Sequence, residues 1–332
     1  NQEWFSSFPT KILKMKKIIL FALSVFVLTS CDNSAKGKRI LSASSGDINV
    51  LSVVVDNDLW EGKVGESIRG VLGDDVYGLP QDEPIFTLKQ MPTAVFSDFA
   101  TKNRTVFKVE KGKAAATDYL ENAFATPQKV VVVSGMTDDE IINQIEKNAK
   151  KIVAEFKNEE LKERQRRNRK SLHKSTNIQD KLGLAIEFPS AYRIATEDGN
   201  FFWIRRDIRT GTLNLMLYEM PIDAFVEGDE AINDVIKMRD SIGQKYVSGP
   251  TEGTYMITEE AYTPFIQEVI LDNKPTLETK STWKVSGAFM SGPFINYAIK
   301  DEINNRYIIA EGFAYAPAVD KRDLMFELEA II

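Results

Sequence analysis

The sequence predicts an α+β protein of two domains, and three observations support this prediction. Its 332 residues, 43% of them hydrophobic, suffice for two cores of ordinary size. Short β-branched runs alternate with amphipathic helical stretches in both halves. A polar, basic stretch at 160–174, ELKERQRRNRKSLHK, interrupts the apolar periodicity between the halves. We therefore expect one domain over 46–172 and a second over 173–332.

The first domain is expected to begin as a ferredoxin-like unit. Its elements run strand, helix, strand, strand, helix, strand, at 48–56, 65–72, 84–90, 104–110, 114–124 and 130–133. The two strands in the middle of this order alternate in polarity as paired strands do. The βαββαβ order resembles the ferredoxin-like split βαβ fold.

A long helix is expected to close the first domain. Thr137 and Glu140 have the spacing of a capping box at its start. The apolar residues that follow fall on one helical face: Ile141, Ile145, Ala149, Ile152, Val153 and Phe156. Five Arg or Lys residues then lie within 164–170. They suit the solvated end of this helix, which we favour, or a contact with an anionic partner such as lipid headgroups or acidic glycan.

The second domain is expected to be an antiparallel sheet packed by a middle helix and a terminal helix. A hairpin is predicted over 201–208 and 212–220, followed by a helix over 232–246. Further strands are predicted at 254–259, 264–271, 277–286 and 306–316. The last helix carries Leu324, Leu328 and Ile331, with Asp320 as its expected N-cap. This element order resembles a Mog1/PsbP-like sandwich.

The N-terminal segment is predicted to be a targeting signal. Residues 1–14 are expected to be an upstream extension, and residues 15–30 combine a basic start with an apolar run too short to span a bilayer. Leu28-Thr29-Ser30-Cys31 resembles a bacterial lipobox. That resemblance implies cleavage between Ser30 and Cys31 and acylation of Cys31, which would anchor the chain in a membrane. The small, polar residues 31–45 are the expected tether.

Composition excludes several classes of function. Without residues 1–30, 38 basic and 47 acidic residues remain, and the net charge of −9 argues against a nucleic-acid partner. One Cys and one His exclude a Cys/His zinc cluster, and we expect no metal and no cofactor. No phosphate loop, nucleophile elbow or zinc-protease motif occurs, so we expect no enzyme. The acid pairs at 74–75, 82–83 and 259–260 are adjacent in sequence, which suits solvation better than catalysis.

Several local phrases resemble one family. They are Gly78–Pro84, Trp283, Phe289–Phe294, Glu311–Pro317 and Lys321-Arg322. On these phrases the chain resembles the Bacteroidota lipoprotein family of unknown function DUF4837, from the lipobox to the last helix. The resemblance implies an envelope lipoprotein and carries no catalytic residue, ligand or activity. Ser291 stands where the family prefers Gly.

The first candidate binding site is a loop rich in large apolar groups. It comprises Trp283, Phe289, Met290, Gly292, Pro293 and Phe294, with Gly292-Pro293 as a turn. The alternative, which we favour, buries Phe289 and Phe294 in the core of their own domain. The acidic loop Gly78–Pro84, beside Tyr77, is a second candidate.

The function expected from these features is non-enzymatic. We expect a lipid-anchored binding or assembly accessory that faces the periplasm from the outer membrane, with an envelope protein or the cell wall as partner. The alternative is a cell-wall glycan hydrolase or lyase that uses a pair of carboxylates from distant segments. Two facing acids with a raised pKa in a cleft would favour the enzyme. An apolar groove would favour binding.

Overall fold

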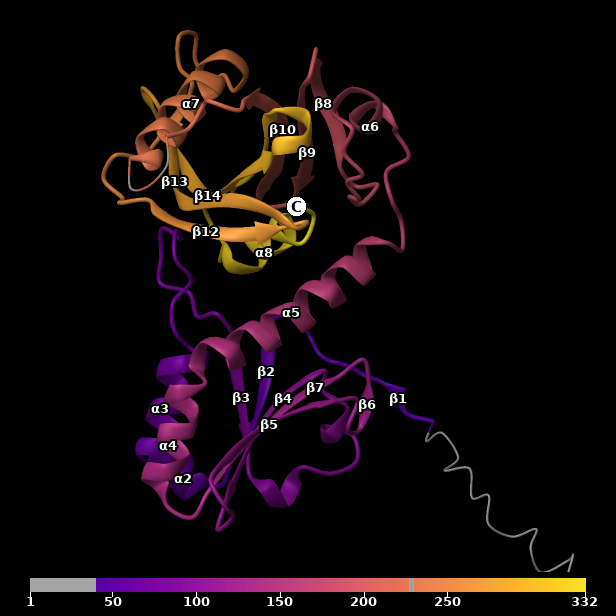
Figure 1. The fold of residues 1–332 in the computed structure, drawn as a ribbon, viewed down its shortest axis with the longest axis vertical. Helices are drawn as coiled ribbons and strands as arrows, with labels where there is room; N and C mark the ends of the chain where they lie inside the picture. Colours follow the sequence, from indigo (N-terminus) through magenta and orange to yellow (C-terminus); the bar gives the residue numbers. More distant parts are fainter. Residues whose placement is uncertain (1–39, 227, 229) are drawn as a thin grey trace, which may run out of the picture. The chain divides into compact units, whose positions relative to one another are not determined.

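Five strands form a mixed sheet in the first half of the chain (Figure 1). The computed structural model describes residues 40–226, 228 and 230–332. The sheet order is β3-β2-β4-β7-β5, in which β5 is antiparallel to β7 and the other neighbours are parallel. Its strands are β2 (Val50–Val54), β3 (Thr87–Met91), β4 (Thr105–Lys111), β5 (Ala116–Glu121) and β7 (Lys129–Gly135). The short strands β1 (Ser42–Ala43) and β6 (Ala125–Thr126) pair with each other.

Helices α2 (Asn57–Glu61), α3 (Lys63–Leu72), α4 (Asp138–Lys147) and α5 (Ala149–Asn168) complete this domain. The β-branched and aliphatic side chains of the parallel strands pack against the apolar stripes of α3, α4 and α5, as their periods of two and 3.6 residues require. Two short 3₁₀ turns, η1 (Thr93–Val95) and η2 (Ala100–Lys102), connect β3 to β4. The mixed sheet with helices confirms the α+β prediction for this half.

The ferredoxin-like arrangement expected here is wrong in two respects. Residues 114–124 were expected to be helical, but 116–121 form strand β5. Thr117 and Tyr119 are two residues apart and lie on the same face of this strand, as the period of two requires. Thr117 donates a hydrogen bond to Gln144 of α4, and the ammonium of Lys151 in α5 lies over the Tyr119 ring. The strands expected to pair with each other, β3 and β4, instead lie on either side of β2. A mostly parallel sheet replaces the expected antiparallel one.

The single long helix expected after Thr137 is two helices. The Thr137 half of the capping box is present, since the Glu140 amide donates to Thr137 Oγ1 over 3.3 Å. The Glu140 carboxylate accepts from the amide of Met136, one residue before the N-cap, instead of from Thr137 itself. The helix is interrupted at Asn148, whose side-chain amide donates to the Gln144 carbonyl over 2.8 Å. This local hydrogen bond competes with continued helix geometry.

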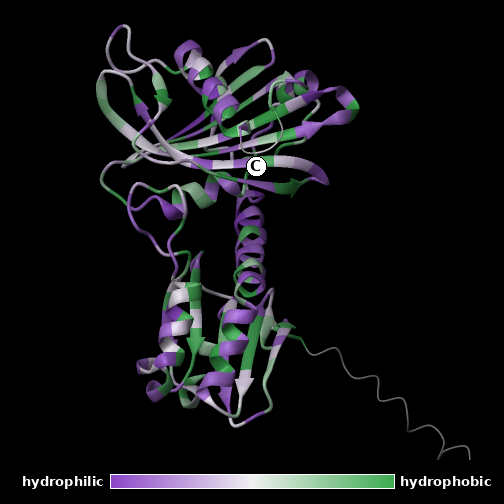
Figure 2. Ribbon diagram, turned by 60° about the vertical axis from the view of Figure 1, so that its left-hand side comes forward, coloured by the Kyte–Doolittle hydropathy of each residue, from purple (hydrophilic) through white to green (hydrophobic). Residues whose placement is uncertain are grey.

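Helix α5 is largely hydrophilic, as Figure 2 shows. Several of its charged side chains are nevertheless not free in solvent, because they bind other residues of the chain. The buried Glu160 accepts from Arg104 over 2.7 Å and from the Asn49 amide over 3.1 Å. Burial opposes the ionisation of Glu163, but hydrogen bonds from Arg166 and Arg167 lower its pKa to about 2. These cations of the basic stretch are therefore engaged by a carboxylate of their own helix.

The second half forms an antiparallel, half-barrel sheet of eight strands. Its order is β11-β13-β14-β15-β10-β9-β8, and β12 also pairs with β13. The strands are β8 (Arg193–Asp198), β9 (Phe201–Ile208), β10 (Gly211–Pro221), β11 (Met256–Thr258), β12 (Phe265–Leu271), β13 (Lys274–Val285), β14 (Ala288–Asp301) and β15 (Arg306–Tyr315). The predicted antiparallel sheet is confirmed.

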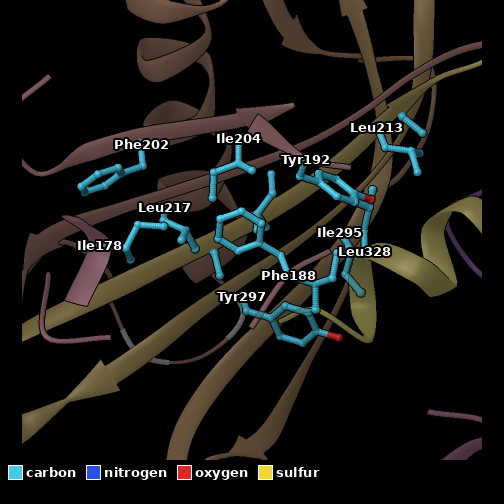
Figure 3. Packing of buried hydrophobic residues seen from close by; sticks show 14 of the residues in the cluster. Ile178, Phe188, Tyr192, Phe202, Ile204, Leu213, Leu217, Ile295, Tyr297 and Leu328 are labelled. Carbon is cyan, nitrogen blue, oxygen red and sulfur yellow. The ribbon is translucent and has the colours of Figure 1, made fainter. Parts of the chain in front are cut away.

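Helices cover both faces of this sheet. Helix α7 (Ala231–Tyr246) packs on one face through Val235 and Met238. Helices α6 (Asn177–Leu182) and α8 (Arg322–Glu329) pack on the other, and the 3₁₀ turn η3 (Glu302–Asn304) joins β14 to β15. Figure 3 shows the core between the sheet and helices α6 and α8. It includes Phe188 and Tyr192, from the segment before β8.

The N-cap expected at Asp320 is wrong by one residue. Helix α8 begins at Arg322 with Lys321 at the N-cap position, and neither Lys321 nor Asp320 supplies a side-chain cap. The carboxylate of Glu83 does so instead, accepting from the Lys321 amide over 2.7 Å and the Arg322 amide over 2.7 Å. A residue of the first domain therefore satisfies amides that the helix leaves without intrahelical partners.

Candidate functional site

The second domain contains a cleft of about 1260 Å³. Its floor comes from the face of β10, β14 and β15 opposite to α7. One wall comes from α6 and the segment 183–187 that follows it. The lining also includes the β12–β13 turn, η3 and the last three residues. The end of α5 contributes Asn168 and Arg169.

The floor is apolar because residues opposite each other in an antiparallel pair share a face of the sheet. Leu217 lies opposite Ala310, and Ile308 lies opposite Ile299. Leu184, Ile186 and Ile331 add aliphatic groups at the sides. Leu217, Ala310 and Ile308 are almost wholly buried. The apolar surface that the cleft exposes therefore comes mainly from half-buried aliphatic residues: Leu184, Ile186, Leu271 and Ile299.

Charged residues form the rim, and each of them is paired. The lining contains four cations, Arg169, Lys181, Lys274 and Arg306, and four carboxylates, Glu187, Glu219, Asp272 and Asp301. Arg306 binds Glu219 over 2.7 Å, Asp301 over 3.3 Å and the carbonyl of Leu182 over 2.7 Å. The other three cations pair at 2.7–3.0 Å: Arg169 with Glu187, Lys274 with Asp272, and Lys181 with Glu197.

The carboxylates beside Arg306 are poor proton donors. A hydrogen bond from Arg306 lowers the pKa of Glu219. Burial opposes the ionisation of Asp301, but hydrogen bonds from Asn304 and Arg306 keep its pKa below the ordinary value. A general acid at neutral pH needs a raised pKa. Glu159, whose pKa burial does raise, lies on α5 and does not line the cleft.

The structure brings the residues of the first candidate binding loop together, but as strands rather than as a loop. Residues 288–301 form β14, in which Gly292 pairs with Trp283 and Pro293 with Thr282 of β13. A Cβ atom at Gly292 would lie 2.1 Å from the carbonyl oxygen of Ala314. The glycine is therefore required for a close approach of β15, and the expected Gly-Pro turn is wrong.

The large side chains of this segment have different environments. Trp283 is buried and donates to the Ala314 carbonyl over 3.2 Å, and Phe294 is buried beneath Arg239, whose guanidinium carbon lies 3.4 Å from the ring centroid. Met290 is half-buried, whereas Phe289 is fully exposed. The prediction that these phenylalanines are buried in the core of their own domain therefore holds for Phe294 and is wrong for Phe289. Of the two, only Phe289 is accessible to a partner.

The second candidate loop contacts the second domain. Tyr77 stacks on Phe265 with ring centroids 4.8 Å apart. Gly78 has a φ of +82°, and a Cβ there would lie 2.7 Å from Cβ of Lys280. Both the positive φ and the close approach require glycine. Tyr77, Gly78 and Glu83 of this segment therefore contact the second domain, whereas Gln81 and Asp82 are exposed.

Sequence reasoning missed a buried ion pair beneath α7. Arg239 and Glu311 are almost wholly buried and form two hydrogen bonds of 2.8 and 2.7 Å, while Asn296 donates to the same carboxylate over 2.7 Å. Arg239 lies on the apolar face of its helix. This position could have predicted the ion pair from the sequence, because a charge buried on such a face requires a partner. The cleft itself was missed because its lining comes from distant segments.

Ser30 and Cys31 lie outside the described residues. Within the described part of the chain, no helix is long and apolar enough to cross a membrane. The same residues include no group of three or more His, Cys, Asp or Glu side chains arranged to hold a metal ion. His173, the one imidazole of the sequence, stacks on Phe188 with ring centroids 4.8 Å apart.

Comparison with known families divides the chain in two. Residues 171–332 match the family described as domain of unknown function DUF4837, and residues 44–169 match a second one, domain of unknown function DUF8532. The chain therefore carries a DUF8532 domain followed by a DUF4837 domain. The DUF4837 match is narrower than the sequence resemblance suggested, since Gly78–Pro84 lies in the other domain. No curated protein matches the chain.

Proposed function

We propose that this protein is a lipid-anchored envelope protein. Its second domain binds a partner in the cleft and catalyses no reaction on it. The observation that carries the binding role is an aliphatic floor enclosed by charges that already neutralise each other. Such a surface gains free energy by excluding water from an apolar occupant.

The alternative is a carboxylate-dependent hydrolase or lyase of cell-wall glycan. It would need one of the two acids that bind Arg306, Glu219 or Asp301, to hold a proton at neutral pH. The lowered pKa of both carboxylates disfavours that role. If the alternative holds, the purified protein should release soluble fragments from cell-wall glycan, and Glu219→Gln or Asp301→Asn should abolish the release.

The anchor is proposed to be acylated Cys31, with the protein on the periplasmic face of a Bacteroidota outer membrane. The basis is the apolar run that ends in Leu28-Thr29-Ser30-Cys31. Cys31→Ser should leave an uncut precursor that incorporates no acyl label. Persistent labelling of that variant would contradict the anchor. We also propose that the second domain is related to the Mog1/PsbP-like sandwich, because helices cover both faces of its antiparallel sheet.

Site-specific crosslinking tests the binding role in the native membrane. Ile303 lines the cleft and is 91% exposed, while Ile270 is 71% exposed and lies outside the lining. A benzophenone amino acid at position 303 should give a discrete crosslinked product on illumination, and one at position 270 should not. Equal crosslinking from both positions, or none from 303, would contradict a binding role for the cleft.

A further inference from the structure

One wall of the cleft is a segment whose main chain forms no hydrogen bond with the described residues over Leu184–Glu187. Residues 183–188 follow α6 without forming a helix or a strand. The Gly183 amide donates to Gln179 and the Phe188 carbonyl accepts from His173, but no backbone hydrogen bond joins the four residues Leu184–Glu187 to the described chain. A row of free amide and carbonyl groups has the hydrogen-bonding character of a strand edge.

The side chains of this wall alternate as they do in a strand. Leu184 and Ile186 are half-buried and pack against the core of the second domain, whereas Ala185 and Glu187 are exposed. A period of two residues places successive side chains on opposite faces and leaves the main chain available between them. The wall therefore offers backbone groups, while half-buried Leu271 and Ile299 of the cleft lining offer aliphatic surface.

The charges of the cleft indicate what kind of occupant it accepts. Its four cations and four carboxylates give no net charge, and each pairs within the domain or with the end of α5. A charged occupant would find no unpaired opposite charge among the described lining residues, whereas a neutral one needs none. A lipid tail could fill the floor but would leave the amides of Leu184–Glu187 without partners.

We propose that the cleft binds an extended, uncharged segment of another polypeptide, which adds as a strand along Leu184–Glu187 and places alternate aliphatic side chains on the floor. Main-chain hydrogen bonds would supply affinity, and the floor would select side chains by shape, as in other cases of strand addition. This inference rests on the proposed binding function and specifies the class of its partner.

The test uses the full chain and a defined probe. The probe is an end-capped octapeptide of alternating Val and Thr, carrying a neutral fluorophore and followed by fluorescence anisotropy. We expect saturable binding and slower hydrogen exchange of the amides in Leu184–Glu187. Ile303→Asp should weaken binding about tenfold or more, because it places a charge beside the apolar occupant. The matched variant Ile270→Asp, also exposed but outside the lining, should bind within about twofold of the parent protein.

Two further probes separate strand addition from simple apolar binding. The same peptide methylated on every amide nitrogen keeps its apolar groups but has no N–H donor, so it should not bind measurably. Equal binding of the methylated peptide would overturn the inference. Binding of the fatty acid cis-parinaric acid in place of the peptide would also overturn it, while leaving the proposed binding role intact. That broader role fails on a different result, the absence of crosslinking from position 303.

Discussion

Replacing Glu83 with Ala should destabilise the second domain from a position in the first. The Glu83 carboxylate accepts three hydrogen bonds at α8, two from the Lys321 amide and one from Arg322, and the Lys321 site is buried. Loss of a side-chain cap costs about 0.5–2 kcal/mol, and loss of the charge at a helix N-terminus about 0.3–1 kcal/mol. Amides left buried without an acceptor add to this cost. We therefore expect the free energy of unfolding to fall by about 2–3 kcal/mol.

The assay is urea denaturation followed by circular dichroism, with two comparison variants. Glu83→Gln keeps one acceptor oxygen and should lose less stability than Glu83→Ala. Asp82→Ala removes the neighbouring carboxylate, which is exposed, and should change stability by no more than about 0.5 kcal/mol. If Glu83→Ala were no more destabilising than Asp82→Ala, the capping argument would be refuted.

Three other predictions concern stability and use the same denaturation assay. Phe294→Ala should cost about 3–5 kcal/mol because Phe294 is buried, whereas Phe289→Ala should stay within about 0.5 kcal/mol; similar losses in both would contradict the assigned environments. Glu311→Ala should cost about 3–5 kcal/mol, because it leaves the Arg239 charge buried without its partner, and a neutral result would refute this role of the pair. The pKa of Glu163 is lowered from 4.5 to about 2 on folding, so its stabilising effect is present above pH 4.5 and lost as the pH falls towards 2. Glu163→Gln should therefore be less stable than the parent at pH 6, and the difference should shrink at pH 2.5; a difference that does not change with pH would contradict the linkage.

Local patterns predicted most of the elements, because they depend on residues that are neighbours in sequence. The β-branched runs at 50–54 and 129–135 form central strands, and the capping box at Thr137 begins a helix. The errors arose where a residue's role depends on a distant segment. In the sequence Gly292 resembles a turn residue, but in the structure it is needed because the carbonyl of Ala314 lies close to it. Residues 116–121 form a strand because they pair with β7.

The candidate site was less predictable than the fold. The floor of the cleft joins residues of β10, β14 and β15, whose neighbours across the sheet are set by register rather than by local sequence. Pairing of the rim charges also depends on this register, as Arg306 and Glu219 show. The sequence did single out Phe289, but only burial distinguishes this exposed residue from the buried Phe294.

The cap on α8 also has a consequence for the order in which the chain acquires its structure during synthesis. Glu83 and Lys321 are 238 positions apart, so the ribosome completes the acceptor long before the amides that it binds. At roughly 5–20 residues per second, the interval is about 10–50 s. Throughout that time Glu83 lacks its contacts with α8, and Tyr77 lacks its partner until Phe265 has been made, even if the sheet beside them has already formed. The first domain therefore presents an unpaired acceptor at Glu83 until the last helix of the second domain has been made.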